Sequence, residues 1–159
     1  MEIERKYLIH KLPDHLEAYP HRTLEQAYLC TEPVVRVRRD ADDYILTYKS
    51  KGLMMREEYN LPLTKEAYRH LLEKADGRII TKERYCIPYG DHLTIELDVF
   101  AGDLAPLLLA EVEFSSEEEA EQFSPAAVGL EEYLCRDVTF TPGMTMGAYW
   151  RRNRLGLDA

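Results

Sequence analysis

Charged side chains recur at alternate positions in seven short segments of this sequence, and the acids and bases are sorted into different segments. The acids form three pairs, Glu2 with Glu4, Glu96 with Asp98, and Glu111 with Glu113. The bases include two pairs, Arg36 with Arg38 and Lys82 with Arg84, and the single positions Lys6, Lys49 and Arg56. Because side chains two positions apart lie on the same face of a β-strand, each segment carries its charges on one face.

Paired carboxylates on a strand favour the binding of cations. Residues i and i+2 lie roughly 6.6 Å apart, and two carboxylates at that distance repel by about 2.5 kcal/mol at an effective dielectric constant of ~20. Either facing bases or bound divalent metal ions can offset that repulsion. The first case describes a solvated outer face with ion pairs between strands. The second describes a site in which carboxylates hold metal ions while Arg and Lys hold phosphate oxygens.

A solvated face is the better interpretation of any one segment, but the repetition favours a site. An ordinary solvated face also carries Ser, Thr, Asn and Gln, whereas nearly every alternating pair here is charged. The opposite faces are richer in apolar side chains, for example Ile3 and Tyr7, and Val35 and Val37.

The elements that must position these residues are mostly β-strands, because apolar and polar residues alternate with period two along most of the chain. Thr64 and Ser116 are expected to cap short helices over residues 65–75 and 117–123, the first ended by Gly77. A further strand over 136–141 and a helix near 144–151 are expected in the tail. A mainly β (α+β) fold follows, either a barrel or a two-sheet sandwich. The strands are expected at residues 2–9, 24–30, 34–40, 44–50, 54–61, 78–87, 92–100 and 106–114.

Composition narrows the class of protein. A chain of 159 residues suits one domain, 1–159, and a net charge of −9 disfavours nucleic acid or an anionic membrane as a partner. No apolar run is long enough to span a membrane, and charge from residue 2 excludes a signal peptide. The three cysteines, Cys30, Cys86 and Cys135, show no paired spacing, so a reducing, cytoplasmic location is expected.

The order of these segments resembles the CYTH superfamily, also called triphosphate tunnel metalloenzymes. The segments EIERK, RVR, TYKS, REEY, KERY, IELDVF and AEVEF follow the family's order between Glu2 and Phe114. The small bacterial members, which include inorganic tripolyphosphatases, are the most similar. The resemblance implies a closed, eight-stranded antiparallel β-barrel that forms a tunnel, with a few short helices packed outside. It also implies that the tunnel binds a triphosphate with Mg²⁺ or Mn²⁺.

The resemblance further implies a role for each charged residue. The implied metal ligands are Glu2, Glu4, Glu96, Asp98, Glu111 and Glu113. The implied substrate-binding residues are Lys6, Arg36, Arg38, Lys49, Arg56, Lys82 and Arg84, with Glu58 orienting one of these bases. Glu4, Lys6, Lys82 and Glu111 are the implied catalytic residues.

Metal-dependent hydrolysis of triphosphates is the function that these implications favour, with inorganic triphosphate ahead of nucleoside triphosphates. Adenylyl cyclase and thiamine triphosphatase remain alternatives, and the latter needs an aromatic platform such as Tyr19, Tyr28 or Trp150. A non-enzymatic module that binds polyphosphate or nucleotides is a further alternative. The partner is then a small-molecule triphosphate, and a homodimer is left open.

The C-terminal stretch CRDVTFTPGM departs from the family pattern. Asp137 matches a family aspartate, but Val138 and Thr139 stand where basic residues are expected, and Arg136 is predicted to face the other way. How the tunnel closes at this end is therefore left open.

Overall fold

An antiparallel sheet of ten strands forms most of the computed structural model, which describes residues 1–77, 79–134 and 136–141. Eight longer strands follow one another in the spatial order β1-β9-β8-β7-β2-β3-β4-β6. Two further strands of two residues each, β5 (Met55–Arg56) and β10 (Arg136–Asp137), pair with β1. The longer strands are β1 (Glu2–Leu8), β2 (His21–Thr31), β3 (Val34–Asp40), β4 (Asp43–Lys49), β6 (Glu58–Pro62), β7 (Ile80–Tyr89), β8 (Leu93–Phe100) and β9 (Leu108–Glu113).

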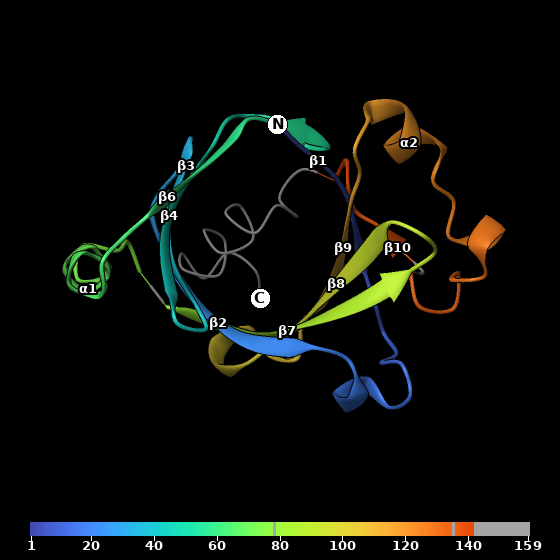
Figure 1. Ribbon diagram of the computed structural model, residues 1–159, viewed down its shortest axis with the longest axis horizontal. Coiled ribbons are helices and arrows are strands. Elements are labelled where there is room, and N and C mark those ends of the chain that lie inside the picture. Colours follow the sequence, from blue (N-terminus) through green and yellow to red (C-terminus); the bar gives the residue numbers. More distant parts are fainter. Residues whose placement is uncertain (78, 135, 142–159) are drawn as a thin grey trace.

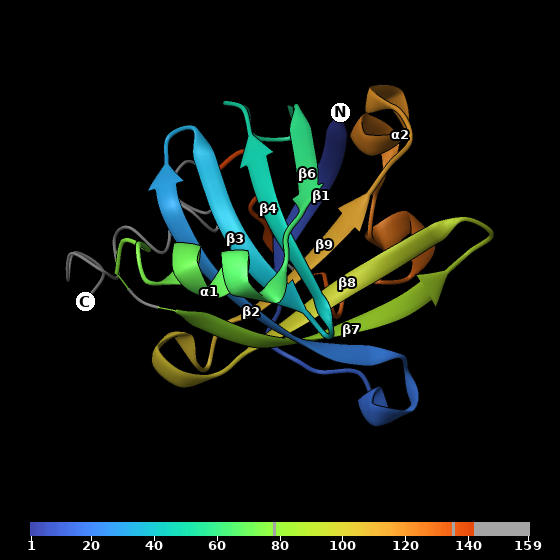
Figure 2. The ribbon, with the colours of Figure 1, turned by 60° about the vertical axis from the view of Figure 1, so that its left-hand side comes forward.

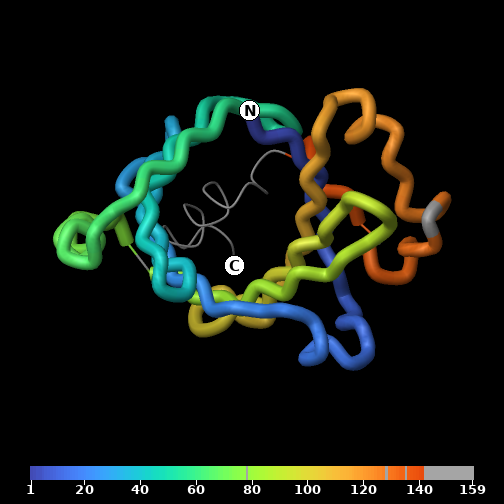
Figure 3. Tube along the Cα trace, viewed as in Figure 1, coloured from blue at the N-terminus to red at the C-terminus, as the bar shows by residue number. Residues whose placement is uncertain are grey.

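The sheet curls into a nearly closed barrel, which confirms the barrel and rejects the sandwich (Figure 1). The expected count of eight needs correction, because the segment 54–61 divides into β5 and β6 and because the tail adds β10. The expected full closure needs correction too. Met55 and Arg56 pair with Ile3 and Glu2 of β1, and the Glu4 N–H donates to the Met54 carbonyl oxygen at 2.9 Å, so a two-residue strand joins the two ends of the sheet. Figure 3 shows the start of the chain beside this segment.

The main apolar cores lie on the outer surface of the barrel wall. One cluster includes Tyr7, Leu97 and Val112, from β1, β8 and β9, and Ala120 of helix α2 (Glu117–Gln122) packs against them. A second cluster joins Ala27 and Val37, from β2 and β3, to Tyr68 of helix α1 (Lys65–Leu72). Figures 1 and 2 show both helices outside the ring of strands. The apolar faces of the strands therefore point outward and are covered, which leaves the charged faces inside.

A third apolar cluster occupies part of the barrel interior. Phe100, Leu109 and Ile80 belong to it, and they continue the inward alternation of Asp98, Glu111 and Lys82. Tyr28 and Val34, of the same cluster, also line the charged cavity. The barrel interior therefore contains a charged cavity and, next to it, an apolar cluster.

Both expected helix caps form. The Thr64 hydroxyl accepts a hydrogen bond from the Ala67 N–H at 3.0 Å, and the Ser116 hydroxyl accepts one from the Glu119 N–H at 3.1 Å. Helix α1 ends at Leu72, earlier than expected, because the next residues form tighter i→i−3 bonds such as Lys74 N–H to Leu71 O at 2.9 Å.

The remaining connections contain little regular structure besides single helical turns. Three single turns of 3-10 helix, η1 (Leu16–Ala18), η2 (Gly102–Leu104) and η3 (Ala126–Val128), connect the strands and helices. The tail strand expected over 136–141 forms only at its first two residues, as β10, and the expected helix near 144–151 lies outside the described residues. None of the helices in the described ranges has the length and apolar character needed to cross a membrane.

Candidate active site

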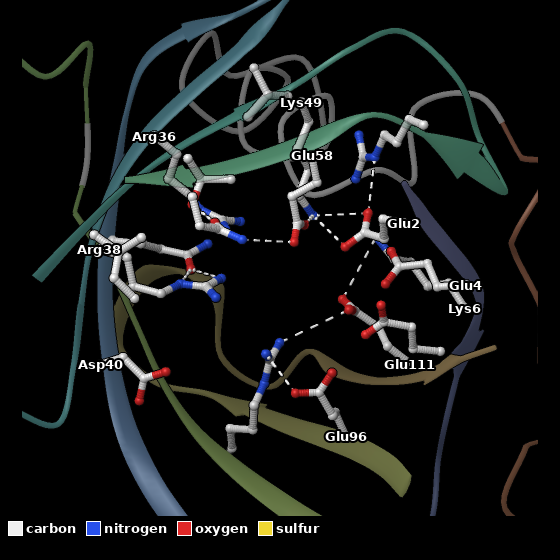
Figure 4. Close-up of a pocket in the computed structure, with 18 of the residues that line it drawn as sticks. Glu2, Glu4, Lys6, Arg36, Arg38, Asp40, Lys49, Glu58, Glu96 and Glu111 are labelled. Atoms are coloured by element: carbon white, nitrogen blue, oxygen red, sulfur yellow. Dashed lines mark hydrogen bonds and ion pairs between the residues drawn. The ribbon is translucent and has the colours of Figure 1, made fainter. Parts of the chain in front are cut away.

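A cavity of about 260 Å³ lies inside the barrel and is lined mainly by charged side chains. Figure 4 shows Arg36 and Arg38 entering it from one side, and Glu2, Glu4 and Glu111 from the opposite side. The structure brings together every site residue expected from the sequence except Asp98. The residues expected from the sequence that line the cavity are Glu2, Glu4, Lys6, Arg36, Arg38, Lys49, Arg56, Glu58, Lys82, Arg84, Glu96, Glu111 and Glu113.

Carboxylates from β1 and β9 face one another across the acidic side of the cavity. Glu4 pairs in register with Glu113, and Lys6 with Glu111. Burial and the nearby charges of Glu111 and Glu2 raise the pKa of Glu4 from 4.5 to about 8. Burial disfavours ionisation of Glu111 as well, but Lys6 and the bases of β7 outweigh it and hold the pKa of Glu111 well below its usual range. Negative charge on Glu4 is therefore poorly compensated, whereas Glu111 stays ionised.

The opposite side of the cavity is basic and contains few acids. Arg36 and Arg38 project from β3, and the Arg38 guanidinium donates two hydrogen bonds to the neutral Oε1 of Gln26, at 2.9 and 2.5 Å. Burial and the charges of Arg36 and Arg84 lower the pKa of Arg38 to about 9. This wall therefore carries positive charge that an anion would stabilise.

Asp98 lies behind the cavity wall, although the family resemblance implied a metal ligand at this position. Its side chain is 0% exposed, and both carboxylate oxygens accept hydrogen bonds from Arg84, at 2.8 and 2.9 Å. The Lys82 ammonium lies 2.7 Å from the same carboxylate. The register explains this placement, because Arg84 stands directly opposite Asp98 on β8. Asp98 thus holds two cavity bases in position, and Glu96 reaches the cavity beside them.

Buried ion pairs link β1 to β4, β5 and β6 at the seam of the barrel, which is the gap between the two ends of the sheet. The Lys49 ammonium lies 3.0 Å from the Glu2 carboxylate and 3.2 Å from that of Glu58, and Arg56 Nε lies 3.3 Å from Glu2. Glu58 therefore contacts a base, Lys49, as its expected orienting role requires. Burial, together with the contact to Glu58, raises the pKa of Glu2 against the opposing charge of Lys49.

The residues at the acidic side suit a divalent cation in their chemistry. Glu4 is buried, and in the described part of the chain its carboxylate has no hydrogen-bonding partner. Burial and the charges of Glu2 and Glu58 also raise the pKa of Glu113, at the exposed rim. Oxygen ligands of this kind are those that Mg²⁺ and Mn²⁺ prefer. Among the described side chains no three acids, His or Cys are grouped closely enough to hold a metal ion as they stand, so the carboxylates would have to turn toward a bound ion.

Several uncharged residues also line the cavity, and the sequence alone indicated no role there for Gln26 or Asn60. Gln26 and Tyr28 come from β2, and Asn60 from β6. Asn60 bridges two neighbours, because its Oδ1 accepts from the Thr47 hydroxyl at 2.6 Å and its Nδ2 donates to Glu58 at 3.0 Å. Strand β2 has no alternating charged pair, so its sequence contains no signal for its inward face. Only its pairing with the arginines of β3 identifies that face.

Of the aromatic residues considered as a platform for an organic group, Tyr28 reaches the cavity. Tyr19 packs against the outer core instead, and Trp150 lies outside the described residues.

Residues 136–141, the described part of the C-terminal stretch, contact the back of β1. Asp137 forms an ion pair with Arg5, which points away from the inward residues Glu4 and Lys6. Arg5 also donates to the carbonyl oxygen of Ala120 at 2.7 Å and to the Thr139 hydroxyl at 3.2 Å. Asp137 and Thr139 therefore hold the strand that carries the acids from behind.

Comparison with known proteins agrees with this geometry. The CYTH domain model matches residues 1–130. The chain is similar to an inorganic triphosphatase of Nitrosomonas europaea, with 41% identity over 128 residues that cover 78% of this chain and 83% of the relative. It is also similar to the crystal structure of the inorganic triphosphatase NE1496, with a TM-score of 0.65, 33% identity, and coverage of 100% of this chain and 96% of that one.

A more distant likeness concerns the fold alone. HpAC1 from Hippeastrum, a putative adenylyl cyclase described as having a dominant triphosphatase activity, matches with a TM-score of 0.66 at 15% identity over 97% of both chains. The family model and the relative at 41% identity each cover most of the sequence. The resemblance read from the charged segments is thereby confirmed, and the chain belongs to the CYTH domain family.

Proposed function

We propose that this protein hydrolyses triphosphates inside the barrel, that inorganic triphosphate is its preferred substrate, and that the reaction requires Mg²⁺ or Mn²⁺. The observation that carries the proposal is the sorting of charge in the cavity. Arg36 and Arg38 lie on one wall, with Gln26 as the partner of Arg38, while Glu4 and its neighbouring acids lie opposite. A triphosphate with its metal ion is a ligand that satisfies both walls together. The similarity to inorganic triphosphatases supports the same conclusion.

The bases would bind and orient the phosphates. Arg36, Arg38, Lys49 and Arg56 line the cavity and would contact phosphoryl oxygens, and Asp98 holds Arg84 beside them. Lys6 and Lys82 are the bases to which we assign catalytic roles, because both lie beside the acidic side and would stabilise charge on the transferred and leaving phosphates. No side chain has to act as a nucleophile, because the attacking group is water.

The carboxylates of Glu2, Glu4, Glu96, Glu111 and Glu113 are those that would hold the metal. We assign the catalytic metal-binding role to Glu4, whose buried carboxylate carries poorly compensated charge, and to Glu111, which the neighbouring bases keep ionised. A bound divalent ion supplies neutralisation of phosphate charge and a lower pKa for an attacking water. Because Glu4 retains its proton up to a pH of about 8 without an ion, metal binding is expected to release that proton.

The small and polar cavity supports inorganic triphosphate over nucleotides or thiamine triphosphate. Its volume is about 260 Å³, and among the described residues Tyr28 is the one aromatic side chain that lines it. Tyr28 is 1% exposed, so little of its ring is available for stacking against a base.

A phosphate-release panel tests the proposal. Inorganic triphosphate, ATP and thiamine triphosphate are each supplied with Mg²⁺, with Mn²⁺ and with EDTA, and cyclic AMP is measured alongside. We expect turnover that is fastest with inorganic triphosphate and absent in EDTA. Cyclic AMP as the main product of ATP would show a cyclase instead, and triphosphate binding without turnover would show a binding module.

Two adjacent residues of β3 provide a matched pair of variants. Arg38→Met removes a charge from the inside of the barrel, and Arg39→Met removes the same charge from its exposed outer face. We expect the first to reduce kcat/KM at least tenfold and the second to change it little. Equal kinetics for the two variants would place the reaction outside the cavity.

A further inference from the structure

Gln26 is an uncharged residue in the wall of a cavity that is lined mainly by charged side chains. It lies on β2 directly opposite Arg38 of β3, and its side chain is 0% exposed. It lines the same cavity as the charged residues. A buried amide normally satisfies both its oxygen and its nitrogen, since an unpaired buried donor costs free energy.

The contacts of Arg38 determine which way this amide faces. Nε and Nη2 of Arg38 both donate to Oε1 of Gln26, at 2.9 and 2.5 Å. A guanidinium has no acceptor, so the amide oxygen must be the atom that faces Arg38. The amide nitrogen therefore points elsewhere, and in the described part of the chain Nε2 has no hydrogen-bonding partner.

A second buried donor without a partner lies on the same wall. Nε of Arg36 also has no hydrogen-bonding partner among the described residues. The acid on the same strand, Asp40, is not the partner of Arg36 Nε. Asp40 pairs instead with Arg22, whose Nε lies 2.5 Å from its carboxylate. Two unsatisfied donors on neighbouring strands, together with the charge of Arg38, indicate a ligand that supplies several acceptor oxygens.

The neutrality of Gln26 adds to this argument. Arg84 shares its charge with the carboxylates of Asp98 and Glu96. Arg38 is held in place by an amide that carries no charge, so its positive charge stays available to a ligand. A glutamate at position 26 would hold Arg38 equally well but would neutralise it.

We propose that Gln26 is a substrate-binding and positioning residue, whose Nε2 donates to a phosphoryl oxygen of the triphosphate while its Oε1 holds the Arg38 guanidinium toward the same anion. This inference rests on the proposed triphosphatase function and adds to it a residue outside the set of charged side chains.

A double-mutant cycle separates the direct contact from the effect through Arg38. Steady-state kcat and KM for inorganic triphosphate are measured with the activating metal for wild type, Gln26→Met, Arg38→Met and the double variant. Met has nearly the shape of Gln but neither its donor nor its acceptor. We expect Gln26→Met to lower kcat/KM about tenfold, chiefly through KM, and to lower it at least threefold further in the Arg38→Met background. Gln122→Met, the same change on the exposed surface of α2, is the control and is expected to leave kcat/KM unchanged.

Specific outcomes overturn the inference. If Gln26→Met keeps kcat/KM within twofold of wild type, Gln26 has neither role. If it has no effect in the Arg38→Met background, Gln26 acts only through Arg38 and does not touch the substrate. A wild-type protein without triphosphatase activity would instead refute the proposed function, and this inference with it.

Gln26→Glu keeps the inference testable if the methionine variant fails to fold. The carboxylate preserves the side-chain shape and gains an ion pair with Arg38, so thermal unfolding is expected at or above the wild-type temperature. It removes the amide donor and neutralises Arg38, so kcat/KM is expected to fall by more than tenfold. Wild-type kinetics in this variant would overturn the proposal.

Discussion

The buried carboxylate of Glu4 is expected to make the stability of the metal-free protein fall as pH rises, and Glu4→Gln should remove that dependence. Glu4 is 6% exposed, and burial, followed by the charges of Glu111 and Glu2, raises its pKa to about 8. Gln has the same shape but no charge. The substitution therefore removes the electrostatic repulsion while it keeps the packing of the cavity.

The direction and size of the effect follow from the two pKa values. Below pH 4.5 the carboxyl group is protonated in both the folded and the unfolded chain, and the stabilisation is complete. Between 4.5 and about 8 only the folded chain keeps the proton, so the free energy of unfolding falls by up to about 1.36 kcal/mol for each pH unit. Over the whole interval the loss approaches about 5 kcal/mol. Glu4→Gln should therefore be about as stable as wild type near pH 4.5 and up to about 5 kcal/mol more stable at pH 9.

Urea unfolding in EDTA at several values between pH 5 and 9 measures this difference. The same series is repeated with Mg²⁺ or Mn²⁺. A bound cation stabilises the ionised carboxylate, so it should raise the stability of wild type most at high pH, and it should affect Glu4→Gln much less. The variant should also lose its triphosphatase activity, since the residue that destabilises the empty site is the one proposed to hold the metal.

Glu121→Gln, which changes an exposed glutamate of α2, is the matched control and should follow the wild-type curve. Parallel pH profiles for wild type and Glu4→Gln would refute the electrostatic argument. Equal stabilisation of both proteins by the divalent ion would refute the assignment of Glu4 as a metal ligand.

Three further predictions concern other buried charges. Burial lowers the pKa of Lys82 to about 7, so kcat/KM should fall above that pH as Lys82 loses its charge, and Lys82→Arg should extend the pH–rate profile to higher pH. Asp98→Asn should lower the free energy of urea unfolding by about 3–5 kcal/mol because it leaves two buried bases without their partner, whereas Glu96→Gln should have a smaller effect because its side chain is 25% exposed. Arg5→Met should lower the free energy of urea unfolding by about 2 kcal/mol through loss of its hydrogen bonds to the Thr139 hydroxyl and to the carbonyl oxygen of Ala120 in α2.

Local sequence determined which residues share a face and where helices begin. Alternation is a property of consecutive residues, so the grouping of Glu2, Glu4 and Lys6 could be read directly, and these three do line one cavity. The helix caps at Thr64 and Ser116 are equally local, and both form as expected. These features need no information about distant parts of the chain.

The register between paired strands determined which side chains reach the cavity, and the sequence alone could not show this. Glu96 and Asp98 share a face of β8, yet Asp98 is sealed behind Arg84 and Lys82 while Glu96 reaches the cavity, because strand pairing places Arg84 opposite Asp98. The inward face of β2, with Gln26, likewise follows only from its pairing with β3. The closing strand β5 exists because Glu2 and Arg56 meet across the seam, a contact between residues far apart in the chain.

The sequence alone therefore determined that seven segments carry their charges on one face, with more apolar side chains on the other, together with the family that this pattern resembles. The tertiary structure decided that the charged face points inward. The physical reason is that α1, α2 and residues that follow α2, such as Leu130 and Leu134, cover the apolar faces from outside. Because the apolar faces are buried on the outside, the charged faces of the strands point into the barrel. The acids and bases therefore lie close together inside it, where a ligand can contact them.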